Sequence, residues 1–158
     1  MSPPDAGSTG APPFACLRLD HLVLRARDAA GLVAFYRDVL GCPVERVLPE
    51  LGLHQLRAGD ALVDIVDTTL PLGAEGGAPP GAGGRNLEHL CLRVAPFDPA
   101  AIAAWLDAAG VPHEAPARRY GADGYGPSIY LRDPEDNRVE LKGPPDAPPH
   151  GPGDRSRA

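Results

Sequence analysis

The chain carries the stretch Leu19-Asp20-His21-Leu22-Val23-Leu24-Arg25 and repeats it as Leu87-Glu88-His89-Leu90-Cys91-Leu92-Arg93. The acidic residue, the histidine and the flanking apolar positions match in the two stretches. A second pair, 40–44 (Leu-Gly-Cys-Pro-Val) and 109–113 (Ala-Gly-Val-Pro-His), follows at the same offset to within one residue. A repeat of this length exceeds a solenoid unit and predicts two copies of a small module folded against each other. Each module then places one histidine at an equivalent point, and two such histidines can share a metal ion.

The length of 158 residues allows one domain with a substantial core. Three segments are rich in proline and glycine: residues 1–15, 70–85 and 144–158. Because such segments bury too little apolar surface to offset their ordering entropy, we predict two disordered tails and a mobile linker. The single domain then spans residues 16–143, with module one at 16–69 and module two at 86–143.

The charge and cysteine content exclude several classes of partner. A net charge of −6 argues against nucleic acid and against an anionic membrane surface, since both require a basic face. No apolar run has the length of a membrane span, and the N-terminus lacks the pattern of a signal peptide. Three cysteines without CxxC spacing predict reduced thiols, and therefore a cytoplasmic location.

The periodicity of apolar residues predicts the order βαβββ in each module. In module one we expect a strand at 16–26, a helix from an Asp28 N-cap to residue 40, and strands at 44–48, 52–57 and 61–67. In module two we expect a strand at 86–94, a helix at 99–109 with Trp105 facing inward, a strand at 111–117, a glycine-rich loop at 118–126, and a hairpin of 128–132 with 138–142. This order does not suit a parallel doubly wound sheet, so we predict an α+β fold with two strongly curved mixed sheets.

The strands of the predicted hairpin have one polar face, because strand residues two apart lie on the same side. One face is apolar and suits the packing of a helix. With the preceding strand, the other face carries His89, Arg93, Ser128, Tyr130, Arg132, Arg138 and Glu140. In module one, Asp64 shares a face with Leu62 and Val66. A polar face as rich as that of module two is exposed to solvent or lines a cavity.

Four segments together resemble the vicinal oxygen chelate superfamily. These are 20–24 (Asp-His-Leu-Val-Leu), 35–41 (Phe-Tyr-Arg-Asp-Val-Leu-Gly), 88–90 (Glu-His-Leu) and 129–141 (Ile-Tyr-Leu-Arg-Asp-Pro-Glu-Asp-Asn-Arg-Val-Glu-Leu). The superfamily includes glyoxalase I, type I extradiol dioxygenases, fosfomycin-resistance proteins and methylmalonyl-CoA epimerase. The resemblance implies two paired βαβββ modules around a metal-binding cavity.

The resemblance also implies one divalent metal ion held by His21, His89 and Glu140. Two imidazoles and a carboxylate leave open positions and suit iron, manganese, nickel or zinc. Members of the glyoxalase I type add a fourth ligand from the last strand of the first copy. That place is held here by Asp64, which is shorter than the usual glutamate.

The resemblance leaves four functions open, all of them on small molecules. The first is a glyoxalase-like lyase or isomerase that acts through a metal-chelated enolate or oxyanion, with Glu140 or Asp64 as proton shuttle. The second is an iron(II) extradiol-type dioxygenase, assisted by Tyr130 or His54. The third is a thiol transferase or hydrolase of the fosfomycin-resistance type, although its loop for a monovalent cation is missing. The fourth is a non-enzymatic drug-binding resistance protein, a type that normally lacks the metal ligands.

We expect the lyase or isomerase, because Asp64 offers the fourth ligand. Glu140, Asp64 and Tyr130 are then the catalytic candidates. The arginine-rich face indicates an anionic substrate, with Arg93, Ser128, Arg132 and Arg138 as its binding residues. Members of the superfamily often form homodimers, and some build each site across two chains, so we also expect a homodimer.

Overall fold

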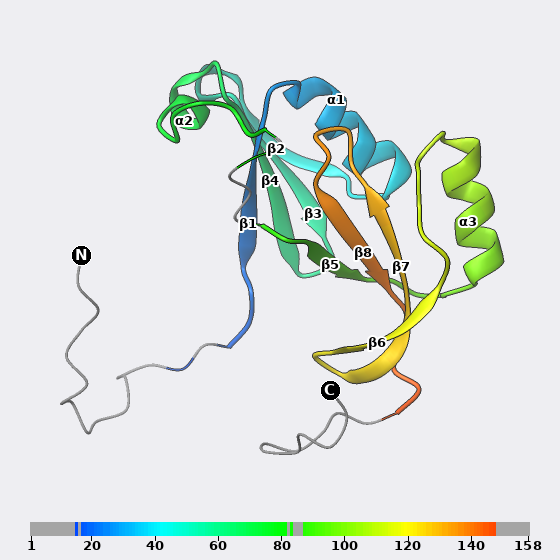
Figure 1. Ribbon diagram of the computed structural model, residues 1–158. Coiled ribbons are helices and arrows are strands. Elements are labelled where there is room, and N and C mark those ends of the chain that lie inside the picture. Colours follow the sequence, from blue (N-terminus) through cyan, green and yellow to red (C-terminus); the bar gives the residue numbers. More distant parts are fainter. Residues whose placement is uncertain (1–14, 16, 82, 84–86, 148–158) are drawn as a thin grey trace.

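The computed structural model describes residues 15, 17–81, 83 and 87–147, and Figure 1 shows how its elements are arranged. Module one contains β1 (His21–Ala26), α1 (Ala29–Ala34), the π-helical η1 (Phe35–Val39), β2 (Val44–Leu48), the 3-10 turn η2 (Pro49–Leu51), β3 (Leu53–Ala58) and β4 (Ala61–Asp67). A short helix, α2 (Pro71–Ala74), follows. Module two contains β5 (Leu90–Arg93), α3 (Pro99–Ala108), β6 (Ala117–Gly121), β7 (Gly124–Arg132) and β8 (Arg138–Lys142).

Each module forms one four-stranded mixed sheet, and the two sheets have the same strand order. The orders are β1-β4-β3-β2 and β5-β8-β7-β6. In each sheet the first strand of the module pairs in parallel with the last, and the other pairs are antiparallel. The predicted α+β fold of two βαβββ modules is therefore confirmed.

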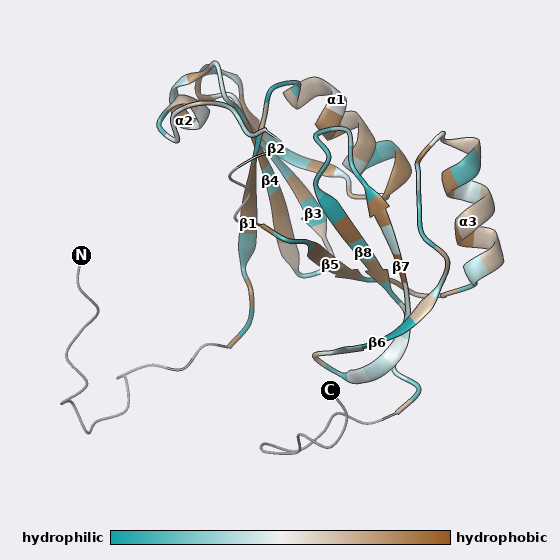
Figure 2. Cartoon of the chain, viewed as in Figure 1, coloured by the Kyte–Doolittle hydropathy of each residue, from teal (hydrophilic) through white to brown (hydrophobic). Residues whose placement is uncertain are grey.

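One apolar core joins the two modules. The inward faces of the strands contribute Leu24, Val63 and Ile65 from module one and Ile129 and Val139 from module two, all of them buried. Figure 2 shows hydrophobic and hydrophilic residues alternating along the strands, as a sheet with one buried face requires. The polar face that the sequence predicts therefore lies on the side of each sheet opposite this core.

The two principal helices begin and end with matching signals. Asp28 and Asp98 are the N-caps of α1 and α3, and the carboxylate of each accepts backbone N–H bonds from the first turn. Gly41 and Gly110 follow the helical segments with φ angles of 71° and 69°, a left-handed conformation that favours glycine. The repeated glycines thus end equivalent helices, as the sequence repeat predicts.

Three expectations for module two are wrong. No strand spans 111–117, where the structure has a single bridge between His113 and Leu131. The segment 118–126 is not a loop, because β6 and β7 form a hairpin across it. Trp105 does not face inward either: it is 56% exposed, and its indole Nε1 donates to the carbonyl of Val39 at 2.9 Å.

Within the expected linker the structure describes residues 70–81 and 83, and α2 occupies 71–74 of them. The Arg25 guanidinium ties this segment to β1 by donating to the carbonyls of Gly73, Gly77 and Ala78. The expected N-terminal tail lies outside the described residues except for Ala15, and the strand expected from residue 16 begins at His21. The expected C-terminal tail is described only to residue 147. No helix in the described parts of the chain is long and apolar enough to cross a membrane.

Candidate metal centre

The predicted metal ligands lie in two equivalent pairs, one on each sheet. His21 begins β1 and pairs with Leu62, which places Asp64 two residues further along β4 on the same face. His89 directly precedes β5, and Glu140 of β8 pairs with Cys91. We name the pair His21 and Asp64 the first half-site, and the pair His89 and Glu140 the second half-site. The sequence repeat therefore places the two pairs at equivalent positions in the two sheets.

Each histidine is held by the acidic residue that precedes it. The Nδ1 atom of His21 lies 2.8 Å from Oδ1 of Asp20, and Nδ1 of His89 bonds Oε2 of Glu88. Because a carboxylate only accepts, the hydrogen belongs to Nδ1, and Nε2 is the nitrogen left for a metal. The hydrogen bond to Asp20 raises the pKa of His21, and His21 in turn lowers the pKa of Asp20. A carboxylate behind the imidazole is typical of metal-ligating histidines.

Asp64 carries an unpaired oxygen in a buried position. It is 4% exposed, and Gln55 on the neighbouring strand donates from Nε2 to its Oδ2 at 2.9 Å. Its Oδ1 has no hydrogen-bond partner among the described residues. A buried carboxylate oxygen without a donor is costly, and a metal ion would satisfy it.

Glu140 is buried among polar groups in the second half-site. Its Oε1 accepts from the Ser128 hydroxyl at 2.5 Å, and its Oε2 lies 3.2 Å from Nε2 of His89. Tyr130 pairs with Glu140 across β7 and β8, and its ring packs edge-on against His89. Burial raises the pKa of Tyr130, and hydrogen bonding to Glu140 adds to the effect. The phenol therefore keeps its proton at neutral pH beside the carboxylate.

The predicted substrate-binding arginines are all engaged with acidic groups. Arg93 pairs with Asp123, and Arg132 contacts Asp136 of the same hairpin. Arg138 pairs with both Glu88 and Glu114, and its guanidinium stacks 4.0 Å from the centre of the Tyr130 ring. The pair with Arg138 helps to orient Glu88 behind His89, whereas Arg132 lines a cavity between α1 and the β7–β8 hairpin.

Two residues near the site are not among the site residues predicted from the sequence. Gln55 is an ordinary strand residue in the sequence, and only its register opposite Asp64 reveals its role. Arg119 belongs to the segment predicted as a loop. It lies over the Tyr130 ring at 5.9 Å, and no ion pair to an acidic residue is seen for it among the described residues. No motif marks either residue.

The two half-sites do not converge within one chain. No group of three or more His, Cys, Asp or Glu side chains that could hold a metal ion is present among the described residues. A cleft of about 760 Å³ runs between the start of β1, the β3–β4 turn and β5, and it reaches His89 and Arg93. Of the second half-site, His89 lines this cleft, whereas Glu140 is buried.

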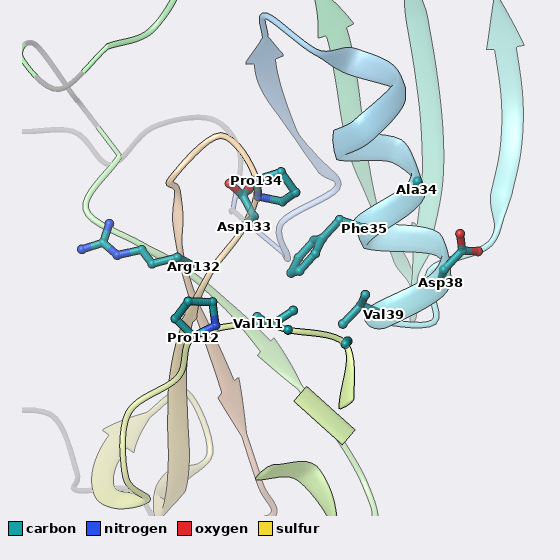
Figure 3. Close-up of a pocket in the computed structure, with 11 residues that line it drawn as sticks. Ala34, Phe35, Asp38, Val39, Val111, Pro112, Arg132, Asp133 and Pro134 are labelled. Carbon is teal, nitrogen blue, oxygen red and sulfur yellow. The ribbon is translucent and has the colours of Figure 1, made fainter. Parts of the chain in front are cut away.

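A second cavity lies away from both half-sites. It has a volume of about 490 Å³ and separates the α1–η1 helix from the β7–β8 hairpin, with Phe35, Val111 and Pro134 in its lining (Figure 3). Its acidic groups are already used, since Asp133 accepts from the Tyr36 hydroxyl at 3.0 Å. This cavity is an apolar gap between structural elements rather than a reaction site.

The donor set of the two half-sites fits a divalent metal ion. It offers the Nε2 atoms of two histidines whose Nδ1 atoms are bonded to carboxylates. It also offers two carboxylates, in each of which one oxygen accepts a hydrogen bond from Gln55 or Ser128 and the other oxygen does not. Nitrogen and oxygen donors of this kind suit zinc, nickel, manganese or iron. His21, Asp64, His89 and Glu140 are the residues that would hold the ion.

Comparison with known proteins identifies a family. The model of the Glyoxalase/Bleomycin resistance protein/Dioxygenase superfamily matches residues 18–141. The virulence protein STM3117 of Salmonella typhimurium is 29% identical over 125 residues, which are 78% of this chain and 82% of that protein. An integron cassette protein from the mobile metagenome of V. cholerae is 25% identical, with a TM-score of 0.65 over 82% of this chain and 97% of the other.

A solved enzyme is also among the similar structures. The lactoylglutathione lyase from Agrobacterium tumefaciens is 26% identical, with a TM-score of 0.58 over 84% of this chain and 95% of that chain.

Proposed function

Because the chain belongs to the Glyoxalase/Bleomycin resistance protein/Dioxygenase superfamily, we propose that it is a divalent-metal-dependent lyase or isomerase of the glyoxalase type. The observation that carries the proposal is the unpaired, buried Oδ1 of Asp64 in the position equivalent to Glu140. Members of the glyoxalase I type hold the metal with four protein ligands, whereas the dioxygenase type needs three. The similarity to a lactoylglutathione lyase supports the same choice.

We further propose that two copies of the chain form each site. One chain would supply His21 and Asp64, and its partner would supply His89 and Glu140. The reason is that each half-site alone offers two protein ligands, and the described residues of one chain do not bring the pairs together. A C2 dimer would contain two such sites, since its symmetry pairs each first half-site with the second half-site of the other chain.

A bound divalent ion would supply Lewis-acid polarisation of a substrate oxygen. Glu140 takes up and returns the proton of the substrate. Its buried carboxylate lies between the hydroxyl of Ser128 and the ring of His89. Tyr130 keeps its proton and presents a hydroxyl donor beside that carboxylate. Burial of Asp64, Ser128 and Glu140 keeps water from these groups.

The substrate is an anionic small molecule, and Arg119 is the residue we assign to its charged group. Arg93, Arg132 and Arg138 already pair with carboxylates of the protein. Arg119 stands over Tyr130 at the second half-site with an exposed side chain. A guanidinium in this position can bind a carboxylate by two parallel hydrogen bonds.

Mixing two inactive variants tests the two-chain site. The variants His21→Ala and His89→Ala each lack one ligand in every site of their own homodimer. In a mixed dimer one site loses both histidines while the other keeps all four ligands. Co-expression should therefore restore about a quarter of wild-type activity, since half of the dimers are mixed and each has one complete site.

The matched control is co-expression of two single variants, His21→Ala and Asp64→Ala, on separate chains. Both changes fall in the first half-site, so no mixed dimer contains a complete site, and activity should stay absent. Equal recovery in both mixtures, or recovery in neither, would show that the four ligands do not meet across two chains.

Metal content and substrate turnover test the reaction class. Protein purified without chelator should contain zinc, nickel or manganese and should act on hydroxy-carbonyl substrates, lactoylglutathione among them. Iron with oxygen uptake on catechols would instead establish the dioxygenase. Protein that takes up no metal after supplementation would leave a drug-binding role.

A further inference from the structure

Lys142 is a buried cation close to Glu140. It lies two residues after Glu140 on the same face of β8 and is 2% exposed. Its Nζ contacts the carbonyl oxygens of Arg119 at 2.6 Å and Gly126 at 3.5 Å, and Oγ of Ser128 at 3.4 Å. None of these three acceptors is a carboxylate. Removing an ammonium group from water costs free energy, so packing alone does not explain a lysine at this position.

The β6–β7 hairpin is shaped around this side chain. A Cβ atom at Gly121 would lie 2.5 Å from Cε and 3.0 Å from Cδ of Lys142. Any side chain at residue 121 would therefore displace the lysine. Glycine at residue 121 therefore leaves room for the end of the Lys142 side chain in its buried position.

The Ser128 hydroxyl lies between Lys142 and Glu140 and contacts both. A hydroxyl has one hydrogen to donate and two lone pairs to accept with. Lys142 can only donate, so Oγ of Ser128 accepts from it and the hydroxyl hydrogen is directed to Oε1 of Glu140, at 2.5 Å. Oε1 is then occupied by a donor, and Oε2, which lies 3.2 Å from Nε2 of His89, is the oxygen that faces the other ligand.

We infer that Lys142 is a positioning residue for the metal centre and acts through Ser128 on Glu140. The chain of contacts Lys142–Ser128–Glu140 fixes the rotation of the carboxylate and presents Oε2 to the ion. Residues behind a ligand that hold it in this way typically change metal affinity by about 10- to 100-fold when removed. The inference rests on the proposed function, because it requires Glu140 to be a ligand.

A double-mutant cycle on metal affinity tests the inference. The dissociation constant for Zn²⁺ is measured by competition with a chelating dye for the full-length wild type, Ser128→Ala, Lys142→Met and the double variant. Each single change should weaken Zn²⁺ binding about 10- to 100-fold, and the double variant should bind no more weakly than the weaker single variant. The visible spectrum of the Co²⁺-loaded protein should change in the same way in both single variants.

The matched control is Arg37→Met, which removes one positive charge from an exposed ion pair with Asp38. It should leave Zn²⁺ affinity unchanged. Thermal unfolding of the metal-free variants identifies any that fail to fold. If Lys142→Met does not fold, Lys142→Gln replaces it in the cycle, because the amide is neutral and still polar.

The inference is overturned if Lys142→Met binds Zn²⁺ as tightly as the wild type. It is also overturned if the fold-changes in dissociation constant of the two single variants multiply in the double variant. Either result leaves the metal centre itself intact. If the wild type binds none of Zn²⁺, Ni²⁺ and Mn²⁺, the proposed function and the inference are overturned together. The two failures are therefore distinguishable.

Discussion

The Gln55 amide donates from Nε2 to Oδ2 of Asp64 over 2.9 Å, and the other oxygen of that carboxylate has no partner among the described residues. Gln55 and Asp64 are direct partners across β3 and β4, as Tyr130 and Glu140 are across β7 and β8. The two modules thus place a polar side chain next to each carboxylate on the same face. In the first module this contact fixes one oxygen of Asp64 and leaves the other free for an ion.

Asp64→Asn should separate stability from metal binding. The amide removes a buried charge, so the free energy of unfolding of the metal-free protein should stay the same or rise by about 1 kcal/mol. The same change removes a ligand, so Zn²⁺ affinity should fall at least about tenfold. Urea denaturation with chelator present and a competition titration measure the two quantities.

Asp60→Asn is the control for this prediction, since Asp60 is a mostly exposed carboxylate at the β3–β4 turn. Neither quantity should change in it. If Asp64→Asn binds Zn²⁺ as the wild type does, Asp64 is not a ligand, and the three-ligand reaction becomes the better interpretation.

Arg119→Met should weaken substrate binding rather than catalysis. Loss of a guanidinium that bonds a carboxylate should raise KM about 10- to 100-fold for an anionic substrate, with kcat nearly unchanged. The effect should disappear with a neutral ester of the same substrate. Steady-state kinetics on both substrates measure the difference, and an equal rise of KM for the ester would rule out the charge contact.

The strands and the polar faces could be predicted because alternation along a strand needs no knowledge of distant parts of the chain. His21, Asp64, His89 and Glu140 lie on the faces that their positions predict. Where the two sheets sit relative to each other could not be predicted, since the hydrophobic pattern of one strand says nothing about the neighbouring module. The separation of the two half-sites therefore emerged only from the structure.

The hairpin β6–β7 was missed because its glycines indicate a loop by composition. Their actual role is close packing: a Cβ at Gly126 would lie 2.7 Å from the carbonyl oxygen of Pro144, and Gly121 makes room for Lys142. Trp105 was misplaced for a different reason. Its helix is rich in alanine on every side, so periodicity does not identify the buried face, and among the residues of α3 only Leu106 is buried.

Tyr36→Phe should destabilise the fold without touching either half-site. Tyr36 is fully buried, and its hydroxyl donates to Oδ2 of Asp133 at 3.0 Å. Removal of the donor leaves a buried carboxylate with fewer hydrogen bonds, which should cost about 1–2 kcal/mol of unfolding free energy. Denaturant unfolding measures the loss.

Tyr120→Phe is the comparison for Tyr36→Phe, because Tyr120 is 47% exposed and water can replace a contact that its hydroxyl group loses. Its effect should stay within about 0.5 kcal/mol. Equal losses in the two variants would contradict a special contribution from the contact between Tyr36 and Asp133. Zn²⁺ affinity should be unchanged in both.

The contact of the segment at 144–147 with the β6–β7 hairpin should weaken in acid. Asp146 pairs with Arg118 at 2.8 Å, and its backbone N–H donates to the carbonyl of Tyr125 at 2.7 Å. The Arg118 guanidinium holds the pKa of Asp146 below its usual 3.8. Because the pKa of Asp146 is lower in the folded state, the ion pair stabilises the docked segment when the pH lies above the pKa of the unfolded state. This contribution is lost as the pH falls through the pKa of the folded state.

Amide chemical shifts of Asp146 and Ala147, followed by NMR from neutral pH to about pH 3, measure this release. Both groups of the pair are about half exposed, so the change should be small and should shrink further at high salt. Arg118→Met should give the acid-form shifts already at neutral pH, because the partner of Asp146 is gone. Shifts in that variant that match the wild type at neutral pH would show that the backbone contacts to Tyr125 hold the segment without the ion pair.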